Sequence, residues 1–154
     1  MANRIIVGAN QVPNKDLTYV RDSFYKDAGV TDLDASNTDI TSLKGAPEVV
    51  TNRFTVLGTN IESLAYSPKE VYIYDCSRCW SLKSLLGVHR ITGRLECSIE
   101  NVLPAAIAGG DIVIWTESGN NRVGKVQIAI RERTIFKAKL AMIQAGYKKY
   151  AVIL

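Results

Sequence analysis

The sequence is poor in the residues on which catalysis and metal binding most often depend. It contains one histidine and three cysteines in 154 residues. A Ser-His-Asp or Cys-His site would therefore depend wholly on His89. Three thiols in a chain without a signal-peptide pattern indicate reduced cysteines rather than a disulfide framework. We therefore expect no enzymatic activity and no cofactor or metal.

Long hydrophobic runs are also absent. No stretch approaches the ~18 uninterrupted apolar residues of a membrane span, so we expect no membrane partner. The hydrophobic fraction of 47% and the charged fraction of 22% are those of an ordinary globular protein. Because single cores are commonly ~100–200 residues long, one domain spanning residues 1–154 is the expectation. Its location is expected to be cytoplasmic.

The charge is distributed unevenly. Residues 1–77 contain seven Lys and Arg against ten Asp and Glu, whereas residues 78–154 contain twelve against five. Such a basic end can meet nucleic acid or an acidic protein, or can simply be a solvated helix face. Seven side chains of this end are the candidate nucleic-acid contacts: Lys125, Arg131, Arg133, Lys137, Lys139, Lys148 and Lys149.

A period of 21 residues organises the middle of the chain. Three columns recur at this spacing: Ser42-Leu43, Ser63-Leu64 and Ser84-Leu85; Ile40, Ile61 and Leu82; and Pro47, Pro68 and His89. Within each unit the apolar residues follow the spacing L-x-L-x-x-N-x-L-x-x-L of a leucine-rich repeat. The third unit has one extra residue between Cys79 and Leu82. A fading fourth unit keeps the spacing of the third, with Leu95, Cys97, Leu103 and Ala106.

The slot that carries Asn in a leucine-rich repeat holds Thr38, Thr59 and Cys79 here. A polar side chain in this slot can bond the backbone groups that the turn leaves free. We expect the two threonines to do so well and the cysteine only weakly.

Two of the units carry a resemblance. Leu33-Asp34-Ala35-Ser36 with 40–47, and Tyr74-Asp75-Cys76-Ser77 with 82–87, resemble the degenerate leucine-rich repeats of tailed-phage proteins. The resemblance covers residues 31–110 and implies a right-handed β-coil of three to four units in a phage or bacterial protein. It brings no catalytic residues.

The ends add an α+β character to this coil. Residues 1–30 predict a strand from Arg4 to Ala9 and a helix from Asp16 to Ala28, which together form a cap. The expected inward residues of this helix are Leu17, Val20, Phe24 and Ala28. Residues 111–154 predict a hairpin, a helix and a last strand. The hairpin pairs 112–115 with 123–130, the helix runs from Glu132 to Ala145, and the strand runs from Tyr150 to Leu154. Ile135, Phe136, Leu140 and Ile143 are the expected inward residues of that helix.

Cys76-Ser77-Arg78-Cys79 is a C-x-x-C motif, which can form a redox pair or half of a zinc site. The chain has no second such motif, and the repeat already places Cys76, Cys79 and Cys97 in inward slots. We interpret all three as packing residues.

Asp34, Thr55, Asp75 and Glu96 occupy one outward strand slot, and stacked coils would align them roughly 5 Å apart. Like charges this close repel one another, so we interpret the column as an acidic strip for a basic partner surface, with simple solubility or cation binding as the alternatives.

Trp80, at the extra residue of the third unit, is either core filler or an interface anchor. The sequence thus favours a binding protein that acts by protein–protein interaction. The alternative is a nucleic-acid or nucleotide binder that uses the basic C-terminal element. For the phage resemblance, inhibition of a host defence or regulatory protein is the implied role.

Overall fold

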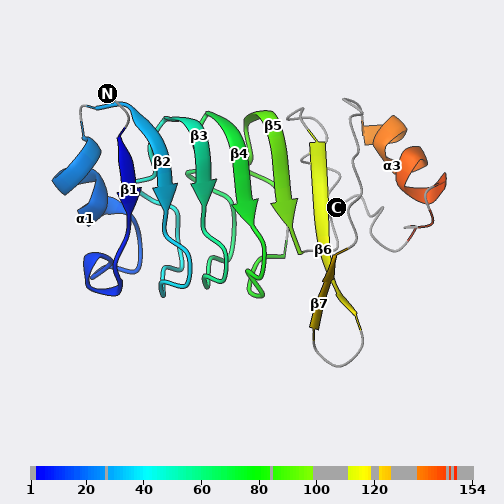
Figure 1. Ribbon diagram of the computed structural model, residues 1–154, viewed down its shortest axis with the longest axis horizontal. Coiled ribbons are helices and arrows are strands. Elements are labelled where there is room, and N and C mark those ends of the chain that lie inside the picture. The colour runs from blue at the N-terminus through cyan, green and yellow to red at the C-terminus, as the bar shows by residue number, and fades with distance from the viewer. Residues whose placement is uncertain are drawn as a thin grey trace.

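The structure is a computed structural model that describes residues 3–26, 28–83, 85–98, 111–118, 122–125, 135–144, 146 and 148. Within these residues the strands form one sheet in chain order (Figure 1). They are β1 (Arg4–Ile6), β2 (Val30–Asp34), β3 (Val49–Thr55), β4 (Glu70–Cys76), β5 (Arg90–Cys97), β6 (Asp111–Ser118) and β7 (Arg122–Lys125). Neighbours from β1 to β6 pair in parallel, and β7 pairs antiparallel with β6. The chain is therefore a parallel β-solenoid whose three turns connect β2 to β5, which confirms the predicted repeat coil.

The core is built from residues that share a register position in successive coils. Leu33 pairs with Phe54, Phe54 with Tyr74, and Tyr74 with Leu95. All four side chains are buried, and the rings of Phe54 and Tyr74 meet edge to face at 5.2 Å between centroids. Parallel strands stack equivalent residues directly on one another, so an apolar residue in every unit gives a continuous core.

The third unit keeps the period although its strand carries a register shift. Between the pairs Val50–Val71 and Arg53–Ile73, β3 contains one residue more than β4. The chain regains that residue in the following turn, where Cys79 and Leu82 are both buried and Trp80 between them is exposed. The predicted insertion is confirmed: two exposed residues, Trp80 and Ser81, stand where the preceding units have one.

In the turn after each strand, the side chain that stands in place of the repeat asparagine donates a hydrogen bond to a backbone carbonyl. Thr38 Oγ1 donates to the carbonyl of Ala35 at 2.8 Å, and Thr59 Oγ1 donates to that of Val56 at 2.7 Å. Cys79 Sγ also donates to the Val56 carbonyl, at 3.2 Å. The expectation is confirmed for the two hydroxyls. Within its own turn the thiol of Cys79 reaches only the Ser77 carbonyl, at 3.6 Å, as expected for a weaker donor.

The N-terminal segment differs from its prediction in two ways. β1 ends at Ile6, and the 3-10 helix η1 (Ala9–Gln11) follows it. The predicted long helix is short: α1 (Thr18–Val20) passes into a π-helical turn, η2 (Arg21–Tyr25). A π turn advances the inward position by one residue, so Tyr25 is buried and Phe24 is exposed. The prediction that Phe24 points inward is therefore wrong, and so is that for Ala28, which is exposed beyond the end of η2.

The C-terminal part contains the predicted hairpin of β6 and β7 and the helix α3 (Ile135–Gln144). The predicted inward positions of α3 are wrong where its side chains are described: Phe136 is 79% exposed, and Leu140 and Ile143 are exposed as well. In Figure 1, α3 lies beyond β6, at the end of the sheet opposite α1. The predicted strand from Tyr150 to Leu154 and the fourth-unit residues after Cys97 lie outside the described residues. None of the helices in the described part has the length and apolar character needed to cross a membrane.

Candidate functional site

The outward column predicted from the repeat exists. Asp34 pairs with Thr55, Thr55 with Asp75, and Asp75 with Glu96, each in neighbouring parallel strands. The coil therefore aligns the four side chains as the 21-residue spacing predicts.

Their environment is not that of an exposed strip. Asp75 is 4% exposed and Glu96 7%; Thr55 is also buried, and Asp34 is half-buried. Asp34 Oδ1 accepts a hydrogen bond from the backbone N–H of Ser36 at 2.9 Å, and Asp75 Oδ1 accepts one from that of Ser77 at 3.0 Å. A side chain that bonds the backbone two residues onward shapes the turn that ends a strand. Asp34 and Asp75 therefore stabilise the turns of the fold itself.

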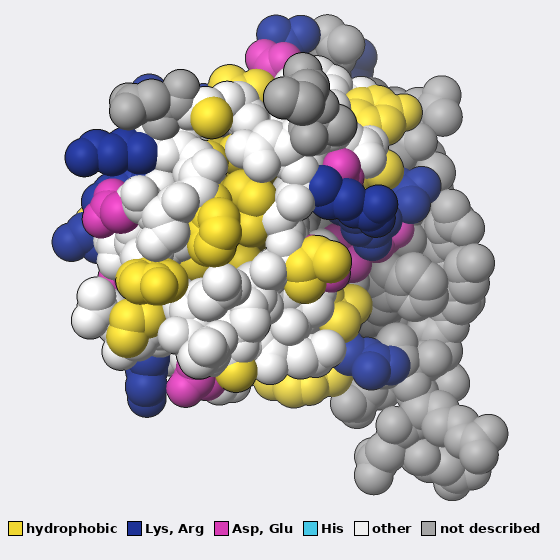
Figure 2. All heavy atoms as spheres, turned by 60° about the vertical axis from the view of Figure 1, so that its left-hand side comes forward, with side chains coloured by type: hydrophobic (Ala, Val, Ile, Leu, Met, Phe, Trp, Pro, Cys, Tyr) yellow, Lys and Arg dark blue, Asp and Glu magenta, His cyan; other side chains and the backbone are white. Residues whose placement is uncertain are grey.

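Two arginines neutralise the buried carboxylates. Arg53 Nη2 lies 3.0 Å from Asp75 Oδ2 and 3.3 Å from Glu96 Oε2, and Arg94 Nε lies 2.9 Å from Glu96 Oε1. Burial, and then the negative charge of Asp75, raise the pKa of Glu96, while the two arginines oppose this rise. In Figure 2, Lys and Arg side chains likewise lie beside Asp and Glu rather than in a patch of one sign.

The prediction of an outward acidic strip is therefore wrong for Thr55, Asp75 and Glu96. Sequence reasoning missed Arg53 and Arg94, although a signal was present. Each stands two residues before Thr55 or Glu96, and side chains two apart in a strand point to the same face. The column is neutralised from within its own sheet face.

Trp80 is the predicted contact that the structure leaves accessible. Its side chain is 55% exposed although both neighbours in the repeat pattern, Cys79 and Leu82, are buried. It is thus not core filler. A large aromatic side chain held out by a rigid turn can supply the buried centre of an interface.

The three cysteines lie inside the coil. Cys76, Cys79 and Cys97 are buried, and none of them forms a disulfide within the described part of the chain. Burial raises the pKa of the Cys76 thiol and that of the Cys79 thiol, so both are protonated near neutral pH. Among the described residues, no group of three or more His, Cys, Asp and Glu side chains is placed to hold a metal ion. The interpretation of the thiols as packing residues is confirmed by their burial.

The remaining candidates are spread over the chain. His89 is exposed and lines a groove beside the N-terminal segment. Of the basic C-terminal residues, Lys137 and Lys148 are exposed and Lys139 is half-buried. Lys125 lies on β7, and Arg131, Arg133 and Lys149 lie outside the described residues.

Comparison of the chain with protein-family models, with curated proteins and with solved structures finds no match in any of the three. The resemblance to phage repeat proteins consequently stays a prediction based on the repeat residues.

Proposed function

We propose that this chain is a non-enzymatic binding protein that recognises a protein partner through its solenoid, with Trp80 as the principal contact. The observation that carries the proposal is the 55% exposure of this indole on a turn that contains one residue more than the turns of the two preceding units. Packing cannot account for an exposed tryptophan, whereas interface anchors are enriched in this residue.

The fold supports this role because it gives Trp80 a fixed base. The turn that bears it begins at Cys79, whose thiol bonds the carbonyl of Val56 in the preceding coil. An anchor on a rigid turn loses little conformational entropy when it binds. We propose further that the coil is of the leucine-rich-repeat type and that the N-terminal segment, which buries Leu17 and Val20, caps its open core.

Asp34 is the member of the outward column that is left partly accessible. We assign it a secondary role, because a rim charge mostly affects the rate of encounter. Thr55, Asp75 and Glu96 keep a role in the framework that holds the face in shape.

The resemblance to phage repeats supports a more specific proposal. We propose that the protein acts in the cytoplasm of a bacterial host, where it binds and inhibits a host defence or regulatory protein.

The test begins with affinity capture from bacterial lysate, followed by purification of the captured protein and titration. Trp80→Ala should weaken binding by about tenfold or more, whereas Asp34→Ala should have a smaller effect. Phe24→Ala, which removes another exposed aromatic ring, is the matched control and should leave affinity unchanged. Equal affinities for all three variants would contradict the placement at Trp80.

Nucleic-acid binding is the second candidate. It is favoured by the composition from Arg122 onward, which includes eight basic residues and one acidic residue. Lys137 and Lys148 offer exposed charge for phosphate contacts. Affinity for DNA or RNA that falls steeply as salt rises, and less steeply after Lys137→Ala and Lys139→Ala, would support it. No binding at low salt would exclude it.

A further inference from the structure

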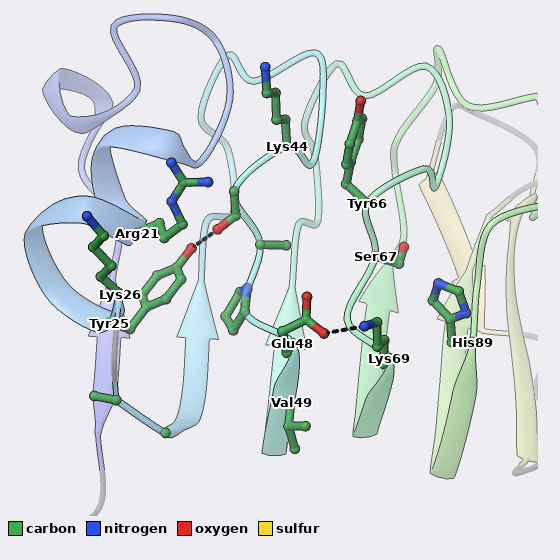
Figure 3. Close-up of a pocket in the computed structure, with 15 residues that line it drawn as sticks. Arg21, Tyr25, Lys26, Lys44, Glu48, Val49, Tyr66, Ser67, Lys69 and His89 are labelled. Atoms are coloured by element: carbon green, nitrogen blue, oxygen red, sulfur yellow. Dashed lines mark hydrogen bonds and ion pairs between the residues drawn. The ribbon is translucent and has the colours of Figure 1, made fainter.

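A groove with a volume of about 670 Å³ lies at the junction of the N-terminal segment with the first coils (Figure 3). One wall is the helical turn η2, and the other is formed by the return segments of successive coils. The lining residues that matter below are Arg21, Lys26, Lys44, Glu48, Tyr66 and Lys69. The size falls within the range of sites for small molecules or short peptides.

The two walls are fixed to one another. Tyr25 Oη donates to the carbonyl of Gly45 at 2.6 Å, and the backbone N–H of Leu17 donates to the carbonyl of Lys44 at 2.8 Å. A Cβ on Gly45 would lie 2.5 Å from backbone atoms of Leu17 and Thr18, so only glycine allows this approach. Contacts within the chain therefore fix the shape of the groove, which lowers the entropy cost of filling it.

The charge of the described lining is mostly positive. Four of these side chains are Lys or Arg and one, Glu48, is acidic. Glu48 is occupied by Lys69 at 2.8 Å, and Arg21 by Asp22 at 3.0 Å. Lys26 and Lys44 are exposed and form no ion pair within the described part of the chain. Figure 3 shows Lys44 beside Tyr66 at one end of the groove, Lys26 on the helical wall, and the Glu48–Lys69 pair at the other end.

Tyr66 is the unusual residue of this groove. It stands at the return bend that Gly45 and Gly87 occupy in the neighbouring coils, and all three have positive φ: 69° for Tyr66, 92° for Gly45 and 103° for Gly87. A bulky residue in this region of φ is strained, and such strain gathers at functional sites. The tyrosine is also 63% exposed, so core packing gives no reason to keep it where glycine fits.

We propose that this groove binds a short acidic segment of a protein partner, with carboxylates at Lys26 and Lys44 and an apolar side chain against Tyr66. The assignment rests on the proposed protein-binding function and names a second contact surface for it. A protein segment suits the mixed lining, because it can place carboxylates at the lysines and neutral groups beside Glu48. A phosphodiester chain carries a charge at every nucleotide and would bring one of them against Glu48.

The experiment is a selection of short random peptides on the immobilised full-length protein, followed by titration of the selected peptides. The peptides should be enriched in Asp and Glu, and Lys44→Glu should weaken their binding by about tenfold. Lys83→Glu, the same charge reversal at an exposed site of another coil, is the matched control and should have little effect.

Tyr66→Gly separates binding from folding. Glycine relieves the strained φ, so the Tm should stay the same or rise while peptide affinity falls. Selected peptides without acidic enrichment, or equal affinity for Lys44→Glu and Lys83→Glu, would overturn the assignment. So would oligodeoxythymidine binding that depends on Lys44 in the absence of peptide binding. A partner whose affinity depends on Trp80 but not on Lys44 would overturn this inference and leave the proposed function standing.

Discussion

The inner and outer sides of the same strands obey different rules. On the inner side, Leu33, Phe54, Tyr74 and Leu95 share one register position and one apolar character. On the outer side, the neighbouring position holds Asp34, Thr55, Asp75 and Glu96, which differ in charge, length and exposure.

The difference lies in how each side is stabilised. An inner side chain needs only an apolar neighbour above and below, and the period guarantees it. A buried outer carboxylate needs a specific partner with the right geometry, and Arg53 supplies it for two strands at once. Inner positions are therefore interchangeable between coils, while outer positions depend on particular residues.

The inner side should show the largest effect of a single substitution. Leu64 is fully buried in the central coil, so Leu64→Ala should lower the free energy of unfolding by roughly 2–5 kcal/mol. Chemical denaturation measures this change. Leu86→Ala is the matched control, because Leu86 is exposed one coil away and should cost far less. Equal losses in the two variants would mean that the division into inner and outer positions is wrong.

The outer network should show an intermediate effect. Arg53→Gln leaves Asp75 and Glu96 close together without their shared cation, at a cost of about 1–2 kcal/mol, because solvent reaches the arginine and screens part of the interaction. Lys69→Gln removes one partner of a fully exposed ion pair and should change stability little. A cost for Arg53→Gln no greater than that for Lys69→Gln would show the network to be dispensable.

The pH dependence of the Arg53→Gln cost sharpens the same comparison. The pKa of Glu96 is raised in the folded state, so the folded chain binds this proton more readily than the unfolded chain. Stability from this group is thus greatest below its unfolded pKa and is lost as pH rises through its folded pKa. Because Arg53 opposes the rise, its loss raises the pKa of Glu96 further. The cost of Arg53→Gln should therefore shrink as pH falls from neutral through the folded pKa of Glu96, which denaturation at a series of pH values measures.

The smallest effect is expected at the turn slot. Cys79→Ser keeps a donor for the Val56 carbonyl, and Thr38 and Thr59 show that a hydroxyl bonds well in this slot. We expect a change within about 1 kcal/mol in the free energy of unfolding and no metal in the purified protein. Stoichiometric zinc, measured by mass spectrometry, would contradict the role of Cys79 as a packing residue.

The sequence predicts what depends on the period and misses what depends on single neighbours. Ile61 and Leu64 follow from a 21-residue spacing, as does the displaced Trp80. The burial of Tyr25 in place of Phe24 depends on one π turn, which a 3.6-residue pattern cannot indicate. Arg53 reaches Glu96 across two strands, and the strand order that allows this contact is a property of the coil, not of the local pattern.

The order of the strands along the sheet also bears on how the chain reaches its folded state. From β1 to β7, every strand lies beside its neighbours in the sequence, so no pairing of these strands waits for a distant segment. Between β2 and β5, the loop that must close before two strands meet is about one repeat long at each step, and its entropy cost is correspondingly uniform. Assembly can therefore start at any adjacent pair and extend in both directions, with each completed coil serving as the template for the next.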